Sequence, residues 1–204
     1  FEFLEVAKKS RIYPFITKIM ISKSFDIYSK LDYEFSINLS VYDILNEDIS
    51  SFIKFKLLEY KDLSKHVVFE ILESEGIDNY DKIKDFISFA KFLGCKIAID
   101  DFGSGYSNFS HVLRLNVDYI KIDSSMIKNI DKDENSQIIT RTIVNFAKEL
   151  GLKTISDYVH NEDVFNMVYD LGVDYSQGYY FGEPVSHPRI AEKPEERKIP
   201  VSII

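Results

Sequence analysis

A repeated unit of helix, glycine and strand constrains the fold of this chain more than any other sequence feature. Three helical patterns carry apolar residues at helical spacing, and each ends at a glycine: Asp81–Leu93 before Gly94, Ser136–Leu150 before Gly151, and Asn161–Leu171 before Gly172. A short strand pattern follows each of these glycines. Alternating helices and strands are typical of βαβ units, so we predict an α/β protein with a parallel sheet.

Six strand patterns occur along the chain. The predicted strands are Tyr33–Leu39, Val67–Leu72, Lys96–Asp101, Asp118–Asp123, Lys153–Ser156 and Asp174–Tyr180. Two further helices are predicted at Phe15–Lys30 and Val41–Leu58, and the opening residues 1–10 also have a helical pattern. Strands and helices in this order fit either an open doubly wound sheet or a closed barrel.

Polar side chains at the strand ends favour the barrel. Carboxylates and one amide stand at the carboxyl ends of five separate strands: Asn38, Glu70, Asp100 with Asp101, Asp123, and Asp157. In a barrel these ends meet around one mouth, whereas distant strand ends of an open sheet would not converge. The first strand also lacks the glycine fingerprint of a dinucleotide-binding fold. We therefore predict a TIM-like (β/α) barrel.

Length and composition refine this prediction. An eight-stranded barrel typically needs about 250 residues, so six strands in 204 residues suggest a barrel that lacks its first two strands. The barrel domain would cover residues 1–185, and the proline-containing segment 186–204 would form a tail. The net charge of −8 argues against DNA or RNA as a partner. The single Cys95 and the lack of a long apolar run or signal peptide predict a cytoplasmic domain without membrane contact.

Adjacent carboxylates end one apolar strand, in the segment IAIDDFGSGYSNFS (Ile97–Ser110). Leaving both Asp100 and Asp101 ionised there would be costly unless cations neutralise them. A pair of divalent ions bridged by one carboxylate would solve this problem. The structural alternative is that Asp101 caps the next helix while Asp100 is solvated.

Other strand ends supply compatible groups. The amide of Asn38, in FSINLS, is a hard neutral ligand for Mg²⁺ or Mn²⁺, although Asn38 viewed alone is better explained as an ordinary strand-to-turn asparagine. Glu70 lies inside the apolar run VFEIL and needs a partner, either a metal or a lysine. Lys121 and Asp123 share one face of DYIKID, where the lysine could stabilise developing phosphate charge or simply form an internal ion pair.

The motifs NLS, ExxES, DDFGSGYS, KID and QGYYFGEP (Gln177–Pro184) resemble the EAL-domain family in identity, order and spacing. The resemblance extends from Phe1 to about Pro184. A lone DFG also occurs in protein kinases, but this sequence has no glycine-rich loop, V-A-I-K lysine or H-R-D element. The resemblance implies a phosphodiesterase that uses two metal ions, Mg²⁺ or Mn²⁺, to hydrolyse cyclic di-GMP to pGpG.

The resemblance also implies a role for each matching residue. Asn38, Glu70 and Asp100 match ligands of the first metal, with Asp100 bridging, and Asp101 and Asp157 match ligands of the second. Lys121 matches the lysine that positions the catalytic water, and Asp123 the acidic residue beside it. Glu73 matches a glutamate that braces a loop at the site and the dimer face, and Gln177 matches a glutamine near the nucleotide.

Three departures from the family pattern concern activity. The Glu-Ala-Leu segment, whose glutamate ligates the first metal, has no counterpart here. The family's A-E-G-V-E-T stretch reads SDYVHN (Ser156–Asn161), so the shorter Asp157 replaces a glutamate. Tyr158 replaces the glycine of that stretch, and His160 replaces its second glutamate. We expect His160 to be an exposed loop residue rather than a compensating ligand, and we expect this 204-residue chain alone to turn over cyclic di-GMP poorly.

Three functional hypotheses follow from the sequence. The first is a cyclic di-GMP phosphodiesterase domain, dimeric and fused to sensory or cyclase modules in a larger bacterial signalling protein. The second is a degenerate domain that binds cyclic di-GMP or a partner without catalysis, which the altered SDYVHN stretch favours. The third is another metal-dependent barrel hydrolase with an unrelated substrate.

Overall fold

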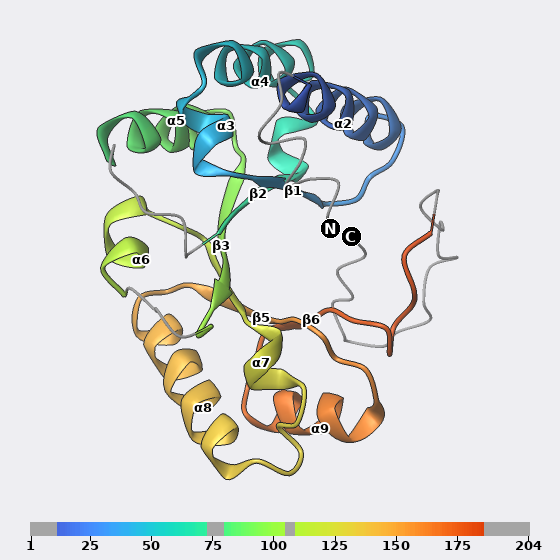
Figure 1. Cartoon of the computed structure of the whole chain (residues 1–204), viewed down its shortest axis with the longest axis vertical. Coiled ribbons are helices and arrows are strands. Elements are labelled where there is room, and N and C mark those ends of the chain that lie inside the picture. Colours follow the sequence, from blue (N-terminus) through green and yellow to red (C-terminus); the bar gives the residue numbers. More distant parts are fainter. Residues whose placement is uncertain (1–11, 73–79, 105–108, 186–204) are drawn as a thin grey trace. The chain divides into compact units, whose positions relative to one another are not determined.

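The structure is a computed structural model of the chain, and it describes residues 12–72, 80–104 and 109–185 (Figure 1). These residues fall into two compact units. The first unit comprises residues up to Ile97 together with Arg114–Asn116, and the second comprises Ala98–Leu113 and the residues from Val117 onward. Each unit is described by itself.

The first unit contains the described helices and strands that precede Lys96, together with the start of the strand that begins there. Its elements are α2 (Tyr13–Tyr28), β1 (Phe35–Leu39), α3 (Val41–Leu45), α4 (Glu47–Glu59), the short 3-10 helix η1 (Ser64–His66), β2 (Val67–Leu72), α5 (Tyr80–Phe92) and the first residues of β3 (Lys96–Phe102). Strands β1 and β2 are parallel, and Asn38 pairs with Glu70 in their register. These two residues, which the sequence places at the ends of successive strands, therefore lie side by side.

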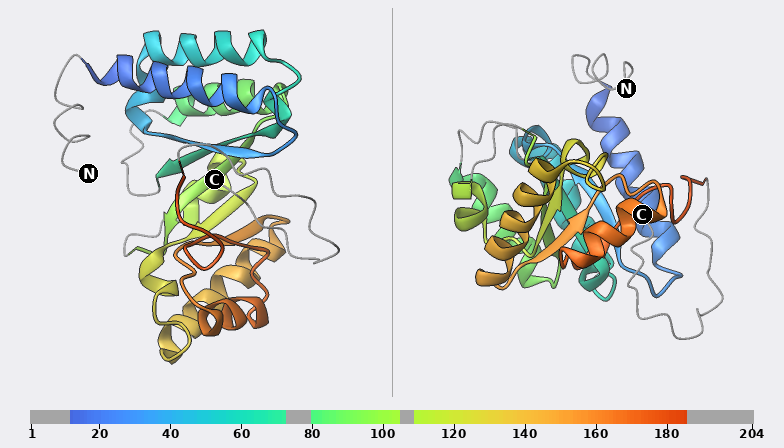
Figure 2. Two further views of the ribbon diagram at one scale, coloured as in Figure 1. Left: turned by 90° about the vertical axis from the view of Figure 1, so that its right-hand side faces the viewer. Right: turned by 90° about the horizontal axis from the view of Figure 1, so that it is seen from below.

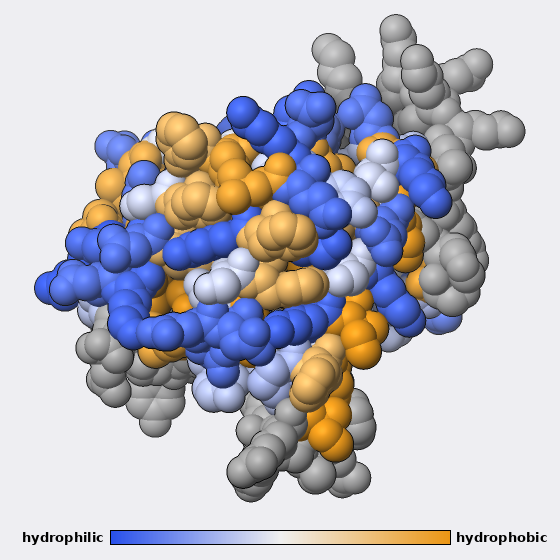
Figure 3. Space-filling view, turned by 90° about the horizontal axis from the view of Figure 1, so that it is seen from above, coloured by the Kyte–Doolittle hydropathy of each residue, from blue (hydrophilic) through white to orange (hydrophobic). Residues whose placement is uncertain are grey.

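Helices α2 and α4 lie together beside the β1–β2 pair (Figure 2). Their inner sides are fully buried at Phe25, Ile49, Ile53 and Leu57. Their outer sides also carry large apolar residues, including Phe15 and Phe55, both at least 60% exposed. Figure 3 shows apolar residues mixed with hydrophilic ones on the face seen from above.

The second unit continues the alternation of strands and helices. It contains the rest of β3, most of α6 (Phe109–Leu115), β4 (Tyr119–Ile122), α7 (Ser124–Ile127), α8 (Glu134–Glu149), β5 (Lys153–Ser156), α9 (Glu162–Asp170) and β6 (Tyr175–Ser176). Strands β3, β4, β5 and β6 are neighbours in that order, and each neighbouring pair is parallel. The βαβ units predicted from the sequence are therefore present.

Two predicted elements differ substantially from the structure, whereas the bounds of the other predicted helices and strands within the described residues agree to within about two residues. The helix predicted at Val41–Leu58 is two helices, because the side chain of Asn46 accepts hydrogen bonds from the backbone nitrogens of Asp48 and Ile49, both at 3.1 Å, and so caps α4. The strand predicted at Asp174–Tyr180 is only the two-residue β6, since the chain leaves the sheet after Ser176. The helical pattern at residues 1–10 and the predicted tail at 186–204 lie outside the described residues.

Helix termination follows the sequence closely. Gly94, Gly151 and Gly172 have φ values of 94°, 70° and 81° shortly after α5, α8 and α9. A left-handed residue at this position allows the chain to leave the helix and enter the next strand. The next strand then begins two to three residues later at Lys96, Lys153 and Tyr175. No described helix is both long enough and apolar enough to cross a membrane.

Candidate functional site

The second unit places a row of polar side chains at the carboxyl ends of its strands. Successive backbone hydrogen bonds connect these ends: from Asp123 N to Phe102 O at 3.0 Å, from Asp157 N to Ile122 O at 3.2 Å, and from Gln177 N to Ser156 O at 2.9 Å. Asp123, Asp157 and Gln177 thus each follow their own strand by one position and lie beside the last residue of the preceding strand. We call Asp100, Asp101, Asp123 and Asp157 the carboxylate row.

A bulge in β3 presents the first two members of the row. Ile99 pairs with Ile120 and Phe102 pairs with Ile122, so β3 has one residue more than β4 between these rungs. The extra residue lies at Asp100–Asp101, and Asp101 has a φ of 57°. Bulges of this kind re-aim side chains and are frequent beside active sites. Aspartate is one of the few residues that tolerates the left-handed region.

Asp100 is buried and forms an ion pair with Lys121. The distance from Lys121 Nζ to Asp100 Oδ1 is 3.0 Å, and the two residues are 3% and 8% exposed, the lysine being the less exposed. The same oxygen of Asp100 accepts a hydrogen bond from the backbone nitrogen of Asp101 at 3.0 Å. The alternative in which Asp100 is solvated is therefore wrong, whereas the internal ion pair considered for Lys121 is present.

The carboxylates of the row act on one another electrostatically. Burial raises the pKa of Asp101, and the nearby charges of Asp100 and Asp123 raise it further against the opposing effect of Lys121. Burial also raises the pKa of Asp157, again opposed by Lys121 and reinforced by Asp100 and Asp123. Lys121 thus acts on Asp100, Asp101 and Asp157, and the carboxylates of the row lie within electrostatic reach of one another in the second unit.

Two members of the row have additional local roles. Asp123 caps α7, because its Oδ1 accepts hydrogen bonds from the backbone nitrogen of Ser125 at 3.0 Å and from the hydroxyl of Ser125. Asp157 Oδ1 accepts a hydrogen bond from the backbone nitrogen of Tyr158 at 2.7 Å. The other oxygen of Asp123, Oδ2, accepts a longer hydrogen bond from the hydroxyl of Ser124, at 3.4 Å.

Gln177 lies at the end of the row, directly after β6. Its backbone carbonyl accepts a hydrogen bond from Val159 N at 2.9 Å, and its side-chain Oε1 is buried with no hydrogen-bond partner among the described residues. Buried amide oxygens normally have a partner. This oxygen is an exception among the described residues.

The glycine after Gln177 is a site residue to which the sequence motifs assigned no role. Gly178 has a φ of 150°, and a Cβ placed on it would overlap the carbonyl oxygen and the backbone nitrogen of Val159. Only glycine permits this close approach of two backbone segments. The Gln-Gly pair at the end of a short strand is the signal that could have identified it.

Two predicted metal ligands, Asn38 and Glu70, belong to the first unit. They lie near the carboxyl ends of β1 and β2, and Glu70 is 2% exposed. His160 is exposed, as expected, and its Nδ1 lies 3.2 Å from the carbonyl oxygen of Tyr158. Glu73 lies outside the described residues. No group of three or more His, Cys, Asp or Glu within the described ranges has a ready metal-binding arrangement.

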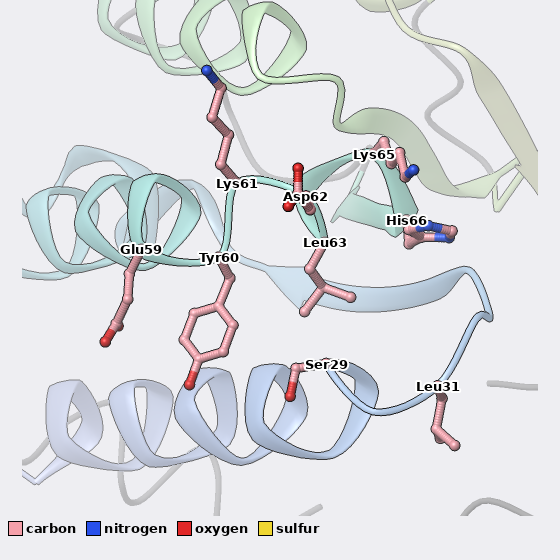
Figure 4. Close-up of a pocket in the computed structure, with 9 residues that line it drawn as sticks. All are labelled: Ser29, Leu31, Glu59, Tyr60, Lys61, Asp62, Leu63, Lys65 and His66. Carbon is pink, nitrogen blue, oxygen red and sulfur yellow. The ribbon is translucent and has the colours of Figure 1, made fainter.

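The first unit also has an open pocket of about 400 Å³, away from the carboxyl ends of its strands (Figure 4). It lies after the carboxyl ends of α2 and α4 and includes His66, which directly precedes β2. Acidic and basic side chains both line it, for example Asp62 and Lys65. Because active sites of TIM-like barrels form at the opposite ends of the strands, this pocket is not the candidate site.

Comparisons with known proteins agree with the motifs and the fold. The family model of the EAL domain matches residues 1–184. Cyclic di-GMP phosphodiesterase PdeA of Borreliella burgdorferi is 33% identical over 150 residues, which are 74% of this chain and 22% of that protein. Cyclic di-GMP phosphodiesterase PdeB of Shewanella oneidensis is 30% identical over 201 residues, 96% of this chain and 24% of that protein. The chain thus spans about a quarter of the length of these relatives.

Solved structures show the same fold. The PaMucR phosphodiesterase, in complex with cyclic di-GMP, has a TM-score of 0.82 at 25% identity, and the match covers 90% of this chain and 82% of that one. Klebsiella pneumoniae BlrP1, in complex with calcium and cyclic di-GMP, has a TM-score of 0.74 at 24% identity over 83% of this chain and 44% of that one. The prediction of a TIM-like α/β fold is confirmed, and the chain belongs to the EAL domain family.

Proposed function

We propose that this chain is a metal-dependent phosphodiesterase domain that hydrolyses cyclic di-GMP to linear pGpG. The observation that carries the proposal is the carboxylate row with Lys121, presented by the strand ends of the second unit. The relatives PdeA and PdeB, which are named cyclic di-GMP phosphodiesterases, support the substrate. The complex of PaMucR with cyclic di-GMP supports it as well.

The chemistry of the row's donors fits a divalent cation, although the described residues do not form a ready metal-binding arrangement. Carboxylate oxygens are hard ligands of the kind that Mg²⁺ and Mn²⁺ prefer. The raised pKa values of Asp101 and Asp157, caused by burial and then by neighbouring charges, mean that the ionised row is unfavourable without a cation. Asp100, Asp101 and Asp157 would hold the ions, and we expect Asn38 and Glu70 of the first unit to complete the coordination. When bound, the ions supply Lewis-acid activation of water and phosphate.

The chain's own residues would position the phosphodiester for in-line attack. The ammonium group of Lys121, fixed by its ion pair with Asp100, would stabilise the negative charge that develops on the phosphate oxygens. Asp123, which caps α7, follows β4 by one residue and would be the acidic residue beside this lysine. The buried Oε1 of Gln177 would accept a hydrogen bond from the bound nucleotide. Glu73 is expected to brace the adjacent loop.

Turnover by the full-length protein tests the proposal. The protein is incubated with cyclic di-GMP and Mg²⁺ or Mn²⁺, and the formation of pGpG is followed by chromatography. We expect metal-dependent turnover that falls about 100-fold or more in Asp100→Asn. The matched control is Asp163→Asn, an exposed aspartate in the first turn of α9, which should retain activity. Unchanged turnover in Asp100→Asn would contradict the assignment of the metal site.

A second candidate function is binding of cyclic di-GMP without hydrolysis. It is favoured by Asp157, a shorter carboxylate than the family's glutamate, one oxygen of which accepts a hydrogen bond from the backbone of Tyr158 at 2.7 Å. A metal ligand that is shifted by a few tenths of an ångström would weaken the second metal position. Micromolar binding of cyclic di-GMP without formation of pGpG would identify this function.

We also propose that the domain works inside a larger cytoplasmic signalling protein. The share of the relatives that the chain spans, 22% and 24%, is consistent with further modules such as sensory or cyclase domains. A homodimer is expected from the family resemblance. Light scattering on the full-length protein would test the dimer by measuring whether its mass is twice that of one chain.

A further inference from the structure

Tyr158 has a backbone conformation that is unusual for its residue type. Its φ is 65°, in the left-handed region, where only glycine, asparagine and aspartate are common. The family stretch A-E-G-V-E-T, which SDYVHN resembles, has glycine at this position. A tyrosine there carries backbone strain. Strain of this kind persists only where the surroundings enforce it, and it is frequent at ligand-binding sites.

Neighbouring backbone segments hold this strained residue in place. Val159 N donates a hydrogen bond to Gln177 O at 2.9 Å, and Tyr180 N donates one to Val159 O at 3.0 Å. Val159 itself is fully buried. The residue after Tyr158 is therefore fixed through both its nitrogen and its carbonyl oxygen, so that the position of Tyr158 is defined by the fold rather than by its own preference.

The side chain of Tyr158 is accessible, and the residue directly follows Asp157 of the carboxylate row. It is 46% exposed, while its backbone nitrogen is bonded to Asp157 Oδ1 at 2.7 Å. The ring of His160 lies 5.4 Å from the tyrosine ring at an angle of 52°. His160 Nδ1 lies 3.2 Å from the carbonyl oxygen of Tyr158, and its Nε2 lies 3.1 Å from the side chain of Asn161. Two adjacent aromatic rings thus form an exposed surface that begins one residue from a carboxylate of the row.

We propose that Tyr158 and His160 form a base-stacking surface for a purine ring of the nucleotide whose phosphate binds at the carboxylate row. This inference rests on the proposed function, because the row must bind the phosphodiester for a base to reach the rings. A nucleobase lies within one nucleotide of its own phosphate, and aromatic side chains stack bases through their faces. The surface adds affinity for the nucleotide without taking part in the chemistry.

Binding of cyclic di-GMP to matched variants tests the proposal. Calcium is used as the ion, since BlrP1 was solved with calcium and cyclic di-GMP. Affinity is measured by isothermal titration calorimetry for the full-length wild type, Tyr158→Gly and Tyr158→Phe. Tyr158→Gly removes the ring but suits the left-handed backbone, so the variant keeps the local conformation. The control is Tyr169→Ala, which removes another exposed tyrosine ring, 66% exposed on α9.

The expected result is a loss of affinity of about 5- to 100-fold in Tyr158→Gly, in keeping with the strength of stacking between a base and an aromatic ring. Tyr158→Phe should stay within about twofold of the wild type, since it keeps the aromatic face, and Tyr169→Ala should not change affinity. Wild-type affinity in Tyr158→Gly would overturn the stacking surface and leave the phosphodiesterase proposal standing. A wild type that binds no cyclic di-GMP would overturn both.

Discussion

A carboxylate of the first unit and the carboxylate row of the second unit use the same chemical group in opposite ways. Asp43 is 1% exposed, and hydrogen bonds from Tyr13 at 3.0 Å, Thr17 at 3.2 Å and the hydroxyl of Ser40 at 2.6 Å satisfy its oxygens. In the row, burial and neighbouring carboxylates raise the pKa of Asp101 and Asp157 instead. Hydrogen-bond donors thus satisfy the carboxylate of Asp43, whereas the carboxylates of the row lie close to other carboxylates.

This difference separates a carboxylate that the fold satisfies from carboxylates to which we assign a function. The hydrogen bonds to Asp43 join the beginning of α2 to the beginning of α3 and complete a capping box with Ser40, so they stabilise the first unit. In the row, Lys121 and local donors bind Asp100, Asp123 and Asp157, yet burial and neighbouring charges still raise the pKa of Asp101 and Asp157. A group that the fold leaves unbalanced is suited to a ligand that supplies the missing charge.

The largest expected effect is a loss of stability when Asp43 is replaced. Asp43→Ala leaves the buried donors of Tyr13, Thr17 and Ser40 without their acceptor, and we expect it to lower the free energy of unfolding by about 3–4 kcal/mol. The control is Asp48→Ala, whose exposed ion pair with Lys18 should contribute at most about 1 kcal/mol. Urea unfolding measures both. Equal losses in the two variants would remove the distinction between a buried network and a surface pair.

The next largest effect is a loss of stability when Gly178, which closely contacts the backbone of Val159, is replaced. Gly178→Ala would force a methyl group against the carbonyl oxygen of Val159, so we expect a loss of about 2–3 kcal/mol in the free energy of unfolding. Gly182→Ala is the matched control, because no atom lies within 4 Å of the position that its new methyl group would take. Thermal unfolding compares the two, and a Gly178→Ala protein as stable as the control would show that this close contact is not required.

A smaller effect, a gain in stability, is expected when Asp101 of the carboxylate row is replaced. Asp101→Asn keeps a residue that tolerates the left-handed backbone and removes one of the crowded charges. Without metal, we expect it to raise the free energy of unfolding at pH 7 by about 0.5–2 kcal/mol, as substitutions that relieve strained functional sites commonly do. Chemical denaturation in the presence of a chelator measures this gain, and a destabilised variant would contradict the idea that the row is unfavourable in the absence of a cation.

The pH dependence of that gain sharpens the comparison. A carboxylate whose pKa is raised in the folded state above its ordinary value of 3.8 contributes stability below that value and loses it as the pH rises through the folded pKa. The advantage of Asp101→Asn over the wild type should therefore be greatest near neutral pH and shrink as the pH falls toward 3.8. Unfolding curves at several pH values would detect this trend, and a gain independent of pH would argue for a cause other than charge.

The smallest effect is expected at Tyr158. Glycine relieves the left-handed strain, worth about 1–2 kcal/mol, but adds backbone entropy to the unfolded chain, worth about 0.5–1 kcal/mol. Tyr158→Gly should therefore raise the free energy of unfolding by about 0–1.5 kcal/mol. Thermal unfolding measures it, and a clear loss of stability would mean that the tyrosine ring supports the fold rather than a ligand.

The sequence predicted the architecture well where local patterns determine it. The helices that end at Gly94, Gly151 and Gly172, and the strands Val67–Leu72 and Lys153–Ser156, lie where their patterns placed them. The carboxylates could be placed at strand ends from the same local patterns. Their common edge was predicted because parallel strands bring their carboxyl ends together.

Features that depend on close approach in space were missed. The bulge at Asp100–Asp101 and the contact of Gly178 with Val159 arise from pairing between separate segments, which no local pattern encodes. The Asp43 network was also missed, although its S-x-x-D spacing from Ser40 is a recognisable capping-box signal. The break at Asn46 was missed because the apolar periodicity continues through it.

Binding of Mn²⁺ tests the central claim most directly. Isothermal titration calorimetry on the wild type is compared with Asp100→Asn and with Asp163→Asn, the exposed control. We expect the wild type and the control to bind Mn²⁺ and to gain thermal stability from it, and we expect Asp100→Asn to lose both responses. Equal binding by Asp100→Asn and the wild type, or no binding by the wild type, would contradict the claim that the carboxylate row holds a divalent cation.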